Sequence, residues 1–140
     1  MEHIVTVSAQ IKKDVVESDV FEKGDRKLLN FGHTLGHAIE KLTGIMHGEA
    51  ISIGMVLAAR LSVKLGFLEE GESERLRKIL LEIGLPVETD LPMKDIYNTL
   101  LKDKKRAGEM MHFILLNGIG EAFVHEIELV SLEKLLHDLY

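Results

Sequence analysis

Apolar residues recur every three or four positions through most of the chain, which is the spacing of one face of an α-helix. Glycine or proline stands between successive stretches, where helices commonly terminate. Five helices are predicted on this basis, over residues 4–16, 28–42, 50–65, 75–83 and 96–101. The predicted breaks lie at Gly24, Gly44, Gly66, Gly84 and Pro92. The body of the chain is therefore predicted to be helical.

The pattern changes near the C-terminus. Residues 111–116 and 122–127 are short apolar runs with β-branched members, and Asn117-Gly118-Ile119-Gly120 separates them. Two such runs around a glycine-containing turn predict a β-hairpin, and residues 131–140 predict a closing helix. There is no internal repeat and no long linker. The sequence therefore predicts a single domain of residues 1–140, a mainly α multi-helix bundle with a small antiparallel β-hairpin near the C-terminus.

Composition narrows the class of protein. The chain has 140 residues, 46% of them hydrophobic and 29% charged, which is enough to bury one core. The net charge of −6 argues against a nucleic-acid surface, because phosphate backbones select basic faces. No apolar run reaches the roughly 20 residues of a membrane-spanning helix, and polar residues stand where a signal peptide would be apolar. We expect a cytoplasmic protein that binds neither nucleic acid nor membrane.

Histidines are the most informative polar residues. The chain has seven of them and no cysteine, so a metal would be held by imidazole and carboxylate groups. In the second predicted helix, Asn30, His33 and His37 share one stripe at positions i, i+3 and i+7. Two imidazoles one turn apart can converge on one point, and the loop before the next helix can fold His47 back toward them. Glu49 is a candidate third ligand, although a capping or supporting role suits it equally.

Two glycines interrupt the same predicted helix. Gly32 and Gly36 each cost about 1 kcal/mol relative to alanine in a helix interior. Their position beside the histidines predicts a close backbone approach, by a ligand or by a tightly packed helix. A lone histidine on an amphipathic helix is more often a hydrogen-bonded polar residue than a metal ligand. That ordinary interpretation applies to the four remaining histidines, His3, His112, His125 and His137.

A basic run stands out in this acidic protein. Residues 102–106, Lys-Asp-Lys-Lys-Arg, carry four positive charges. Such a run at a helix end commonly lies in water and opposes the helix macrodipole. Lysine and arginine also bind carboxylate and phosphate groups, and Lys12, Lys13 and Arg26 add further positive charge. Both interpretations of the basic residues stay open on spacing alone.

Four sequence strings resemble the 3-dehydroquinate synthase family, in the order in which they occur there. They are Arg26-x-x-Leu-Asn-Phe-Gly-His-Thr-x-Gly-His-Ala-Ile-Glu40, His47-Gly-Glu-Ala-x-x-x-Gly-Met55, Gly84-Leu-Pro86 and Asp103-Lys-Lys-x-x-Gly108. The first two strings together are highly specific, whereas the last two alone would mean little. The resemblance runs along nearly the whole chain and implies the fold of that family's C-terminal domain.

The resemblance also implies an activity. Family members are lyases of the shikimate pathway of aromatic amino acid biosynthesis, and convert 3-deoxy-D-arabino-heptulosonate 7-phosphate to 3-dehydroquinate and phosphate. They use NAD and a divalent metal, zinc or cobalt. By resemblance, His33 and His47 match the two histidine ligands of that metal. His37 is similar to a catalytic histidine near the substrate phosphate, and Glu22 matches a residue with a catalytic role in proton transfer.

Binding of the phosphorylated sugar-acid substrate is implied in the same way. Lys12 and Arg26 match positions that bind the carboxylate end of the substrate. Asn30 and Lys104 match positions that bind its phosphate. Family members are commonly dimers, so the resemblance allows a homodimer.

The family pattern is incomplete in this chain. In the family, an N-terminal α/β domain carries a glycine-rich NAD site and a glutamate that completes the metal shell. No such glycine-rich motif follows a strand here, so we expect no cofactor-binding residue for NAD in the chain and a missing NAD-binding domain as its partner. Alone, the chain is expected to be inactive. Two alternatives remain, the helical metal-binding domain of a glycerol or iron-type alcohol dehydrogenase and a non-catalytic isolated domain.

Overall fold

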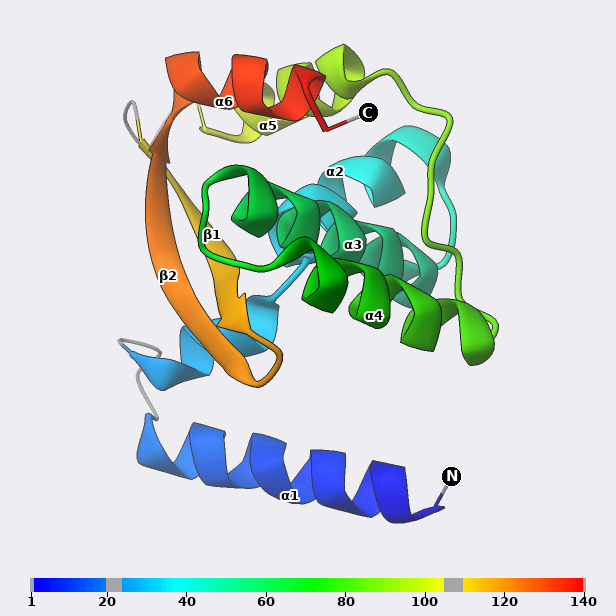
Figure 1. Ribbon diagram of the computed structural model, residues 1–140. Coiled ribbons are helices and arrows are strands. Elements are labelled where there is room, and N and C mark those ends of the chain that lie inside the picture. The colour runs from blue at the N-terminus through cyan, green and yellow to red at the C-terminus, as the bar shows by residue number, and fades with distance from the viewer. Residues whose placement is uncertain (1, 20–23, 105–109, 140) are drawn as a thin grey trace. The chain divides into compact units, whose positions relative to one another are not determined.

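The computed structural model describes residues 2–19, 24–104 and 110–139, with the side chains of residues 103 and 104 left out (Figure 1). The chain divides into two compact units, Met1–Asn30 and Phe31–Tyr140, and each is described by itself. None of the helices in the described ranges is both long and apolar enough to cross a bilayer. The prediction of a single domain over residues 1–140 stays a prediction.

Residues 2–19 and 24–30 of the first unit form two helices. They are the α-helix α1 (Glu2–Ser18) and the short 3-10 helix η1 (Asp25–Asn30). The carboxylate of Asp19 accepts hydrogen bonds from the backbone N–H groups of Gly24, at 2.6 Å, and of Arg26, at 3.2 Å. An aspartate ahead of a helix satisfies N–H groups that have no partner within the helix. Asp19 therefore fixes where η1 begins.

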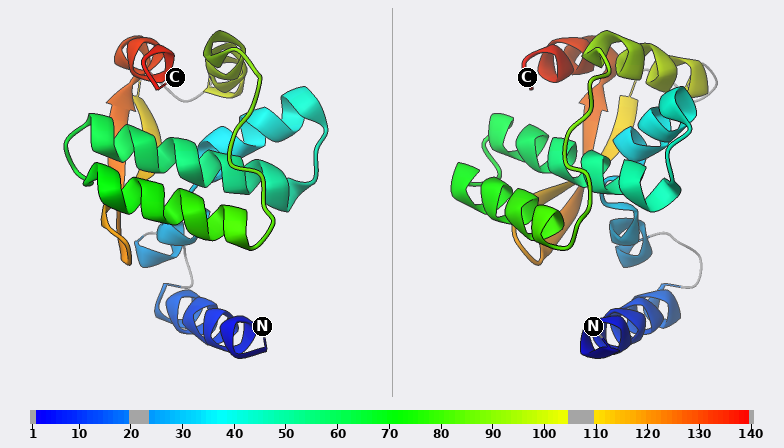
Figure 2. Two further views of the ribbon diagram at one scale, coloured as in Figure 1. Left: turned by 45° about the vertical axis from the view of Figure 1, so that its right-hand side comes forward. Right: turned by 90° about the vertical axis from the view of Figure 1, so that its right-hand side faces the viewer.

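The second unit is built around one long helix. In chain order its elements are α2 (His33–Thr43), α3 (His47–Lys64), α4 (Glu70–Glu82), α5 (Met93–Lys104), β1 (Met110–Gly118), β2 (Glu121–Glu128) and α6 (Leu129–His137). Helix α3 packs against α2, α4 and β1. Figure 2 shows α3 and α4 side by side, and both figures show α5 and α6 neighbouring one another at one end of the hairpin.

Contact on several sides explains the composition of α3. Its buried residues include Ile53, Ala58, Ala59 and Leu61, which point in different directions around the helix. A helix that is apolar over much of its circumference is a buried helix. The main core joins α3 to the other elements through the fully buried side chains of Leu35, Ile39, Ile96, Phe113, Leu115, Leu132 and Leu136. Burying each large apolar side chain contributes about 1.5–3 kcal/mol.

The two strands form an antiparallel hairpin. The pairing runs from Met110 opposite Glu128 to Gly118 opposite Glu121, with an irregularity between Leu116 and Gly118. Gly120 in the turn has φ of 94°, which glycine adopts without strain. At the irregular end, the buried Ser62 hydroxyl of α3 accepts a hydrogen bond from the Leu116 N–H, at 3.0 Å, and donates one to the Ala58 carbonyl, at 2.8 Å. Ser62 thus ties the strand to α3.

The structure confirms the predicted fold class, a mainly α bundle with one antiparallel hairpin near the C-terminus. One predicted element is wrong. Residues 28–42 do not form one helix, because η1 ends at Asn30 and α2 begins at His33. Gly32 between them has φ of 80°, in the left-handed region, which ends a right-handed helix. Asn30 therefore does not share a helical stripe with His33 and His37. Helix α4 also begins at Glu70 and not at Arg75.

Candidate metal centre

Three histidines converge on the surface of the second unit. His33 is the first residue of α2, His37 lies one turn later, and His47 is the first residue of α3. Their ring centroids are 5.4, 5.7 and 5.5 Å apart for the pairs 33–37, 33–47 and 37–47. Each ring offers one nitrogen, and the three nitrogens lie within 4.8 Å of one another. Zinc–nitrogen bonds of about 2.0–2.1 Å place tetrahedral ligand nitrogens roughly 3.3 Å apart, so small side-chain rotations would fit a metal between the rings.

Two of the three rings have Nδ1 engaged. Nδ1 of His33 lies 3.2 Å from the carbonyl oxygen of Phe31, and Nδ1 of His47 lies 2.9 Å from Oε2 of Glu40. A carbonyl or carboxylate oxygen only accepts, so each Nδ1 must carry the proton and donate. A neutral ring protonated at Nδ1 keeps its lone pair on Nε2. Both rings are therefore prepared to offer Nε2 to a metal.

Three glycines bring the helices of the site together. A Cβ on Gly36 would lie 2.8 Å from Cδ1 of Ile51, and one on Gly32 would lie 2.7 Å from the Met55 backbone nitrogen. A Cβ on Gly54 would lie 2.6 Å from the Gly36 backbone nitrogen. Contacts below 3 Å are not tolerated without a shift, so α2 and α3 approach at a distance that only glycine allows. Of the two predicted explanations for Gly32 and Gly36, the structure shows the tightly packed helix.

His37 has a chemical environment that favours its neutral form. Partial burial lowers the pKa of the His37 imidazole below its ordinary value, and the neighbouring rings of His33 and His47 lower it further. The carboxylate of Glu40 acts in the opposite direction. His37 and His47 are exposed and His33 is half-buried. The cluster is therefore open to a ligand from solvent, and the His37 ring can accept a hydrogen bond or a metal.

The other predicted site residues belong to the first unit or have side chains outside the described residues. Lys12 lies on α1, and Arg26 and Asn30 lie on η1, all three within the unit Met1–Asn30. Glu22 and the side chain of Lys104 lie outside the described residues. Their roles stay predictions.

Glu49 was a candidate third ligand. It lies in the first turn of α3 and is half-buried. Among the residues that the structure describes, the converging ligand atoms belong to the three histidines and do not include the Glu49 carboxylate. Glu49 instead borders a depression together with Ile45 and Ile53.

Glu40 is a site residue that the sequence analysis missed. It lies on α2 seven residues after His33 and three after His37, so the three share one helical stripe. Its carboxylate binds His47 across the α2–α3 loop. The i, i+4, i+7 spacing of two histidines and a glutamate was the signal that would have identified it.

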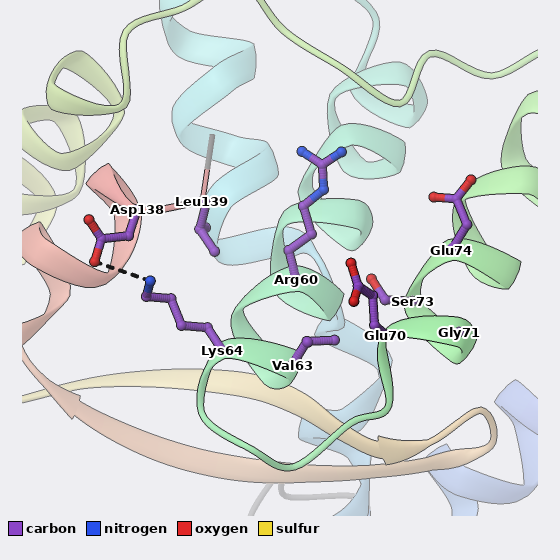
Figure 3. A pocket seen from close by; sticks show the side chains of 9 residues that line it. All are labelled: Arg60, Val63, Lys64, Glu70, Gly71, Ser73, Glu74, Asp138 and Leu139. Atoms are coloured by element: carbon purple, nitrogen blue, oxygen red, sulfur yellow. Dashed lines mark ion pairs between the residues drawn. The ribbon is translucent and has the colours of Figure 1, made fainter.

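A second depression is lined by none of the three histidines (Figure 3). It has a volume of about 790 Å³ between the end of α3, the start of α4 and the C-terminal residues. Arg60 and Lys64 supply positive charge there, and Glu70, Glu74 and Asp138 supply negative charge. The Lys64 ammonium lies 3.1 Å from the Asp138 carboxylate and holds the pKa of Asp138 below its ordinary value. This mixture of charges favours no ligand of one sign.

The fold and the cluster together define a helical domain with three imidazoles gathered on one surface. Residues 1–106 match the family model described as 3-dehydroquinate synthase C-terminal, and the chain belongs to this family. The predicted family resemblance is therefore confirmed.

Curated relatives of the chain carry the name 3-dehydroquinate synthase. The protein from Thermoanaerobacter pseudethanolicus is 41% identical over 140 residues, covering 97% of this chain and 39% of the relative. The protein from Crocosphaera subtropica is 45% identical over 128 residues, covering 88% of this chain and 35% of the relative. The chain thus spans about two fifths or less of the length of these relatives.

Solved structures of related synthases have the same fold. A 2-epi-5-epi-valiolone synthase from Streptomyces hygroscopicus, with NAD+ and Zn2+ bound, superposes with a TM-score of 0.76 and 26% identity. The match covers 98% of this chain and 39% of that one. A 2-deoxy-scyllo-inosose synthase, complexed with carbaglucose-6-phosphate, NAD+ and Co2+, superposes with a TM-score of 0.73 and 28% identity. That match covers 91% of this chain and 39% of the other.

Proposed function

We propose that this chain is the metal- and substrate-binding part of a 3-dehydroquinate synthase, which converts 3-deoxy-D-arabino-heptulosonate 7-phosphate to 3-dehydroquinate and phosphate. The observation that carries the proposal is the convergence of His33, His37 and His47 in a chain of this family. The related synthases that hold Zn2+ or Co2+ together with NAD+ support it. The part of the longer protein outside this chain would bind NAD, which supplies hydride chemistry.

His33 and His47 would hold the metal, zinc or cobalt, through Nε2. The fit rests on donor chemistry, because both Nδ1 atoms are engaged with acceptors and neutral imidazole suits these metals. A metal held there would polarise the substrate oxygen that loses its proton. The shell contributed by this chain then has two histidines, and the glutamate implied by the family resemblance would come from the N-terminal α/β domain of the family.

His37 would act on the substrate and not on the metal. Its lowered pKa keeps the ring neutral near pH 7, so that it can accept or donate a proton close to the substrate phosphate. The N-termini of α2 and α3 lie at the same place, since His33 and His47 are their first residues. Neither helix has a side-chain cap, and uncapped N–H groups at a helix start favour an anion.

The remaining proposed roles concern charge and orientation. Lys12 and Arg26 would bind the substrate carboxylate, for which the arginine fork is well suited. Asn30 and Lys104 would bind the phosphate, and Glu22 would transfer a proton. Fixed contacts at both anionic ends would hold the reacting carbons in one orientation, which is a large part of catalysis in such a reaction.

A chimera tests the proposal. The chain replaces the matching segment of the Thermoanaerobacter pseudethanolicus relative, and phosphate release from the heptulosonate phosphate is measured with NAD and zinc or cobalt. We expect turnover, its loss by at least about 100-fold in His33→Ala and His47→Ala, and none of that loss in the control His112→Ala. A folded chimera that binds NAD and metal but releases no phosphate contradicts the proposal, and oxidation of glycerol in its place would favour a dehydrogenase.

A further inference from the structure

A hydrogen bond across the α2–α3 loop links Glu40 to the histidine cluster. Oε2 of Glu40 lies 2.9 Å from Nδ1 of His47. The Glu40 side chain is 36% exposed and the His47 side chain is 54% exposed, so neither is held in place by the core. This hydrogen bond is the polar contact that the described structure records for the His47 ring, which also packs against the rings of His33 and His37.

His33 and His47 both donate a hydrogen bond from Nδ1, but to different kinds of acceptor. The Nδ1 atom of His33 donates to a backbone carbonyl, that of Phe31, which the turn at Gly32 aims at the ring. The His33 ring is also half-buried. His47 is more exposed and begins its helix, and its acceptor is a side chain. The hydrogen bond at Nδ1 of His47 therefore depends on one replaceable side chain, whereas that of His33 depends on the backbone.

We propose that Glu40 is a positioning residue, which holds His47 in the tautomer that presents Nε2 to the metal. The inference rests on the proposed metal site. An ionised carboxylate accepts the Nδ1 proton, so it excludes the tautomer whose proton sits on Nε2 and would block a metal. It also makes the ring a better donor. Loss of such a carboxylate typically weakens metal binding by about 10- to 100-fold.

The hairpin offers a matched control pair. Nε2 of His112 on β1 lies 2.7 Å from Oε1 of Glu126 on β2, and both side chains are more than half exposed. This pair has the same chemistry as His47 and Glu40, but His112 does not belong to the cluster of converging ligand atoms. Substitutions at Glu126 therefore remove a histidine–carboxylate hydrogen bond without touching the proposed site.

The first experiment needs no metal. Nitrogen-15 NMR of the imidazoles in the metal-free full chain, above neutral pH, reports which ring nitrogen carries the proton. We expect His47 to be protonated at Nδ1, to shift toward the Nε2-protonated form in Glu40→Ala, and to keep the Nδ1 proton in Glu40→Gln, whose amide oxygen still accepts. An unchanged His47 tautomer in Glu40→Ala overturns the inference, whether or not the chain binds metal.

The second experiment measures affinity for zinc and cobalt by calorimetry on the same full-length variants. We expect Glu40→Ala to weaken binding by about 10- to 100-fold, Glu40→Gln to fall between it and the parent, and Glu126→Ala to match the parent. Circular dichroism confirms that each variant is folded. Parent-like affinity in a folded Glu40→Ala variant overturns the inference. If the parent chain alone binds no metal, the tautomer measurement decides the role of Glu40 and the chimera decides the proposed function.

Discussion

Gly54 of α3 lies directly against Gly32 at the start of α2, backbone to backbone. A Cβ built on Gly54 would overlap with the carbonyl oxygen of Gly32. This contact sets how closely the two helices cross. Because one helix carries His33 and His37 and the other carries His47, the spacing of the proposed metal ligands depends on it.

Substitution of Gly54 by alanine tests this dependence. The added methyl group would meet backbone atoms that cannot rotate away, so we expect Gly54→Ala to lower the free energy of unfolding by about 1–3 kcal/mol. Chemical denaturation measures this change, and metal affinity should fall with it. The control is Gly71→Ala on α4, where a Cβ meets nothing within 4 Å. We expect that variant to be unchanged or more stable by up to about 1 kcal/mol. Equal effects at the two sites would refute the steric explanation.

Metal binding by the isolated chain should be weak and should depend on two histidines. The proposed shell within this chain is incomplete, and calorimetry with zinc should show affinity that is lost in His33→Ala and in His47→Ala. His37→Ala should change the affinity much less, because His37 is assigned to the substrate. Tight binding that His37→Ala abolishes would instead make all three histidines ligands and contradict the assignment.

The pKa of His37 should be measurably below 6.5 in the metal-free chain. An unfolded chain then binds this proton more readily than the folded one. The His37 contribution therefore lowers the free energy of unfolding as the pH falls from 6.5 to the lower folded-state pKa. Proton NMR titration of the ring checks the value. In the double variant His33→Ala, His47→Ala the pKa should rise but stay below 6.5, because partial burial persists; no rise would show that the neighbouring rings have no influence.

Removal of the Ser62 hydroxyl should loosen the hairpin from α3. Ser62→Ala leaves the Leu116 N–H without its acceptor in a buried place, which costs about 1–3 kcal/mol of the free energy of unfolding. Hydrogen exchange at the Leu116 amide should accelerate as well. Ser131→Ala on α6 serves as the control, since Ser131 is exposed. A Leu116 amide as protected in Ser62→Ala as in the parent would contradict this role.

The predictable parts of the fold were those marked by glycines at turns and helix ends. The turn before β2 was marked by Asn117 to Gly120, and the ends of α2, α3 and α4 were marked by Gly44, Gly66 and Gly84, each with positive φ. Periodicity alone, however, joined η1 to α2 across Gly32. A glycine inside an apolar repeat does not reveal whether it is helical or left-handed, because the choice depends on what packs against it.

The candidate site also has residues that the sequence predicted and residues that it did not. The spacing of His33 and His37 predicted that their rings can meet. The loop before α3 was predicted to fold His47 back toward them. Glu40 escaped notice because its partner lies across a loop, and the Ser62 contact joins residues 54 positions apart. Such pairings depend on how helices and strands pack against one another in three dimensions, which single-sequence patterns do not encode.

The three rings of the cluster all fall within residues 33–47, so assembling them closes only a short stretch of chain. The entropy lost on closing a loop rises with its length, and here that loss is small. The helical pair α2–α3 can therefore bring its imidazoles together at a small entropic cost, while its apolar faces are buried against α5, the β-hairpin and α6. We expect the three histidines to come together when α2 and α3 pair during folding. A metal ion bound by them would stabilise the folded helical pair relative to the unfolded chain.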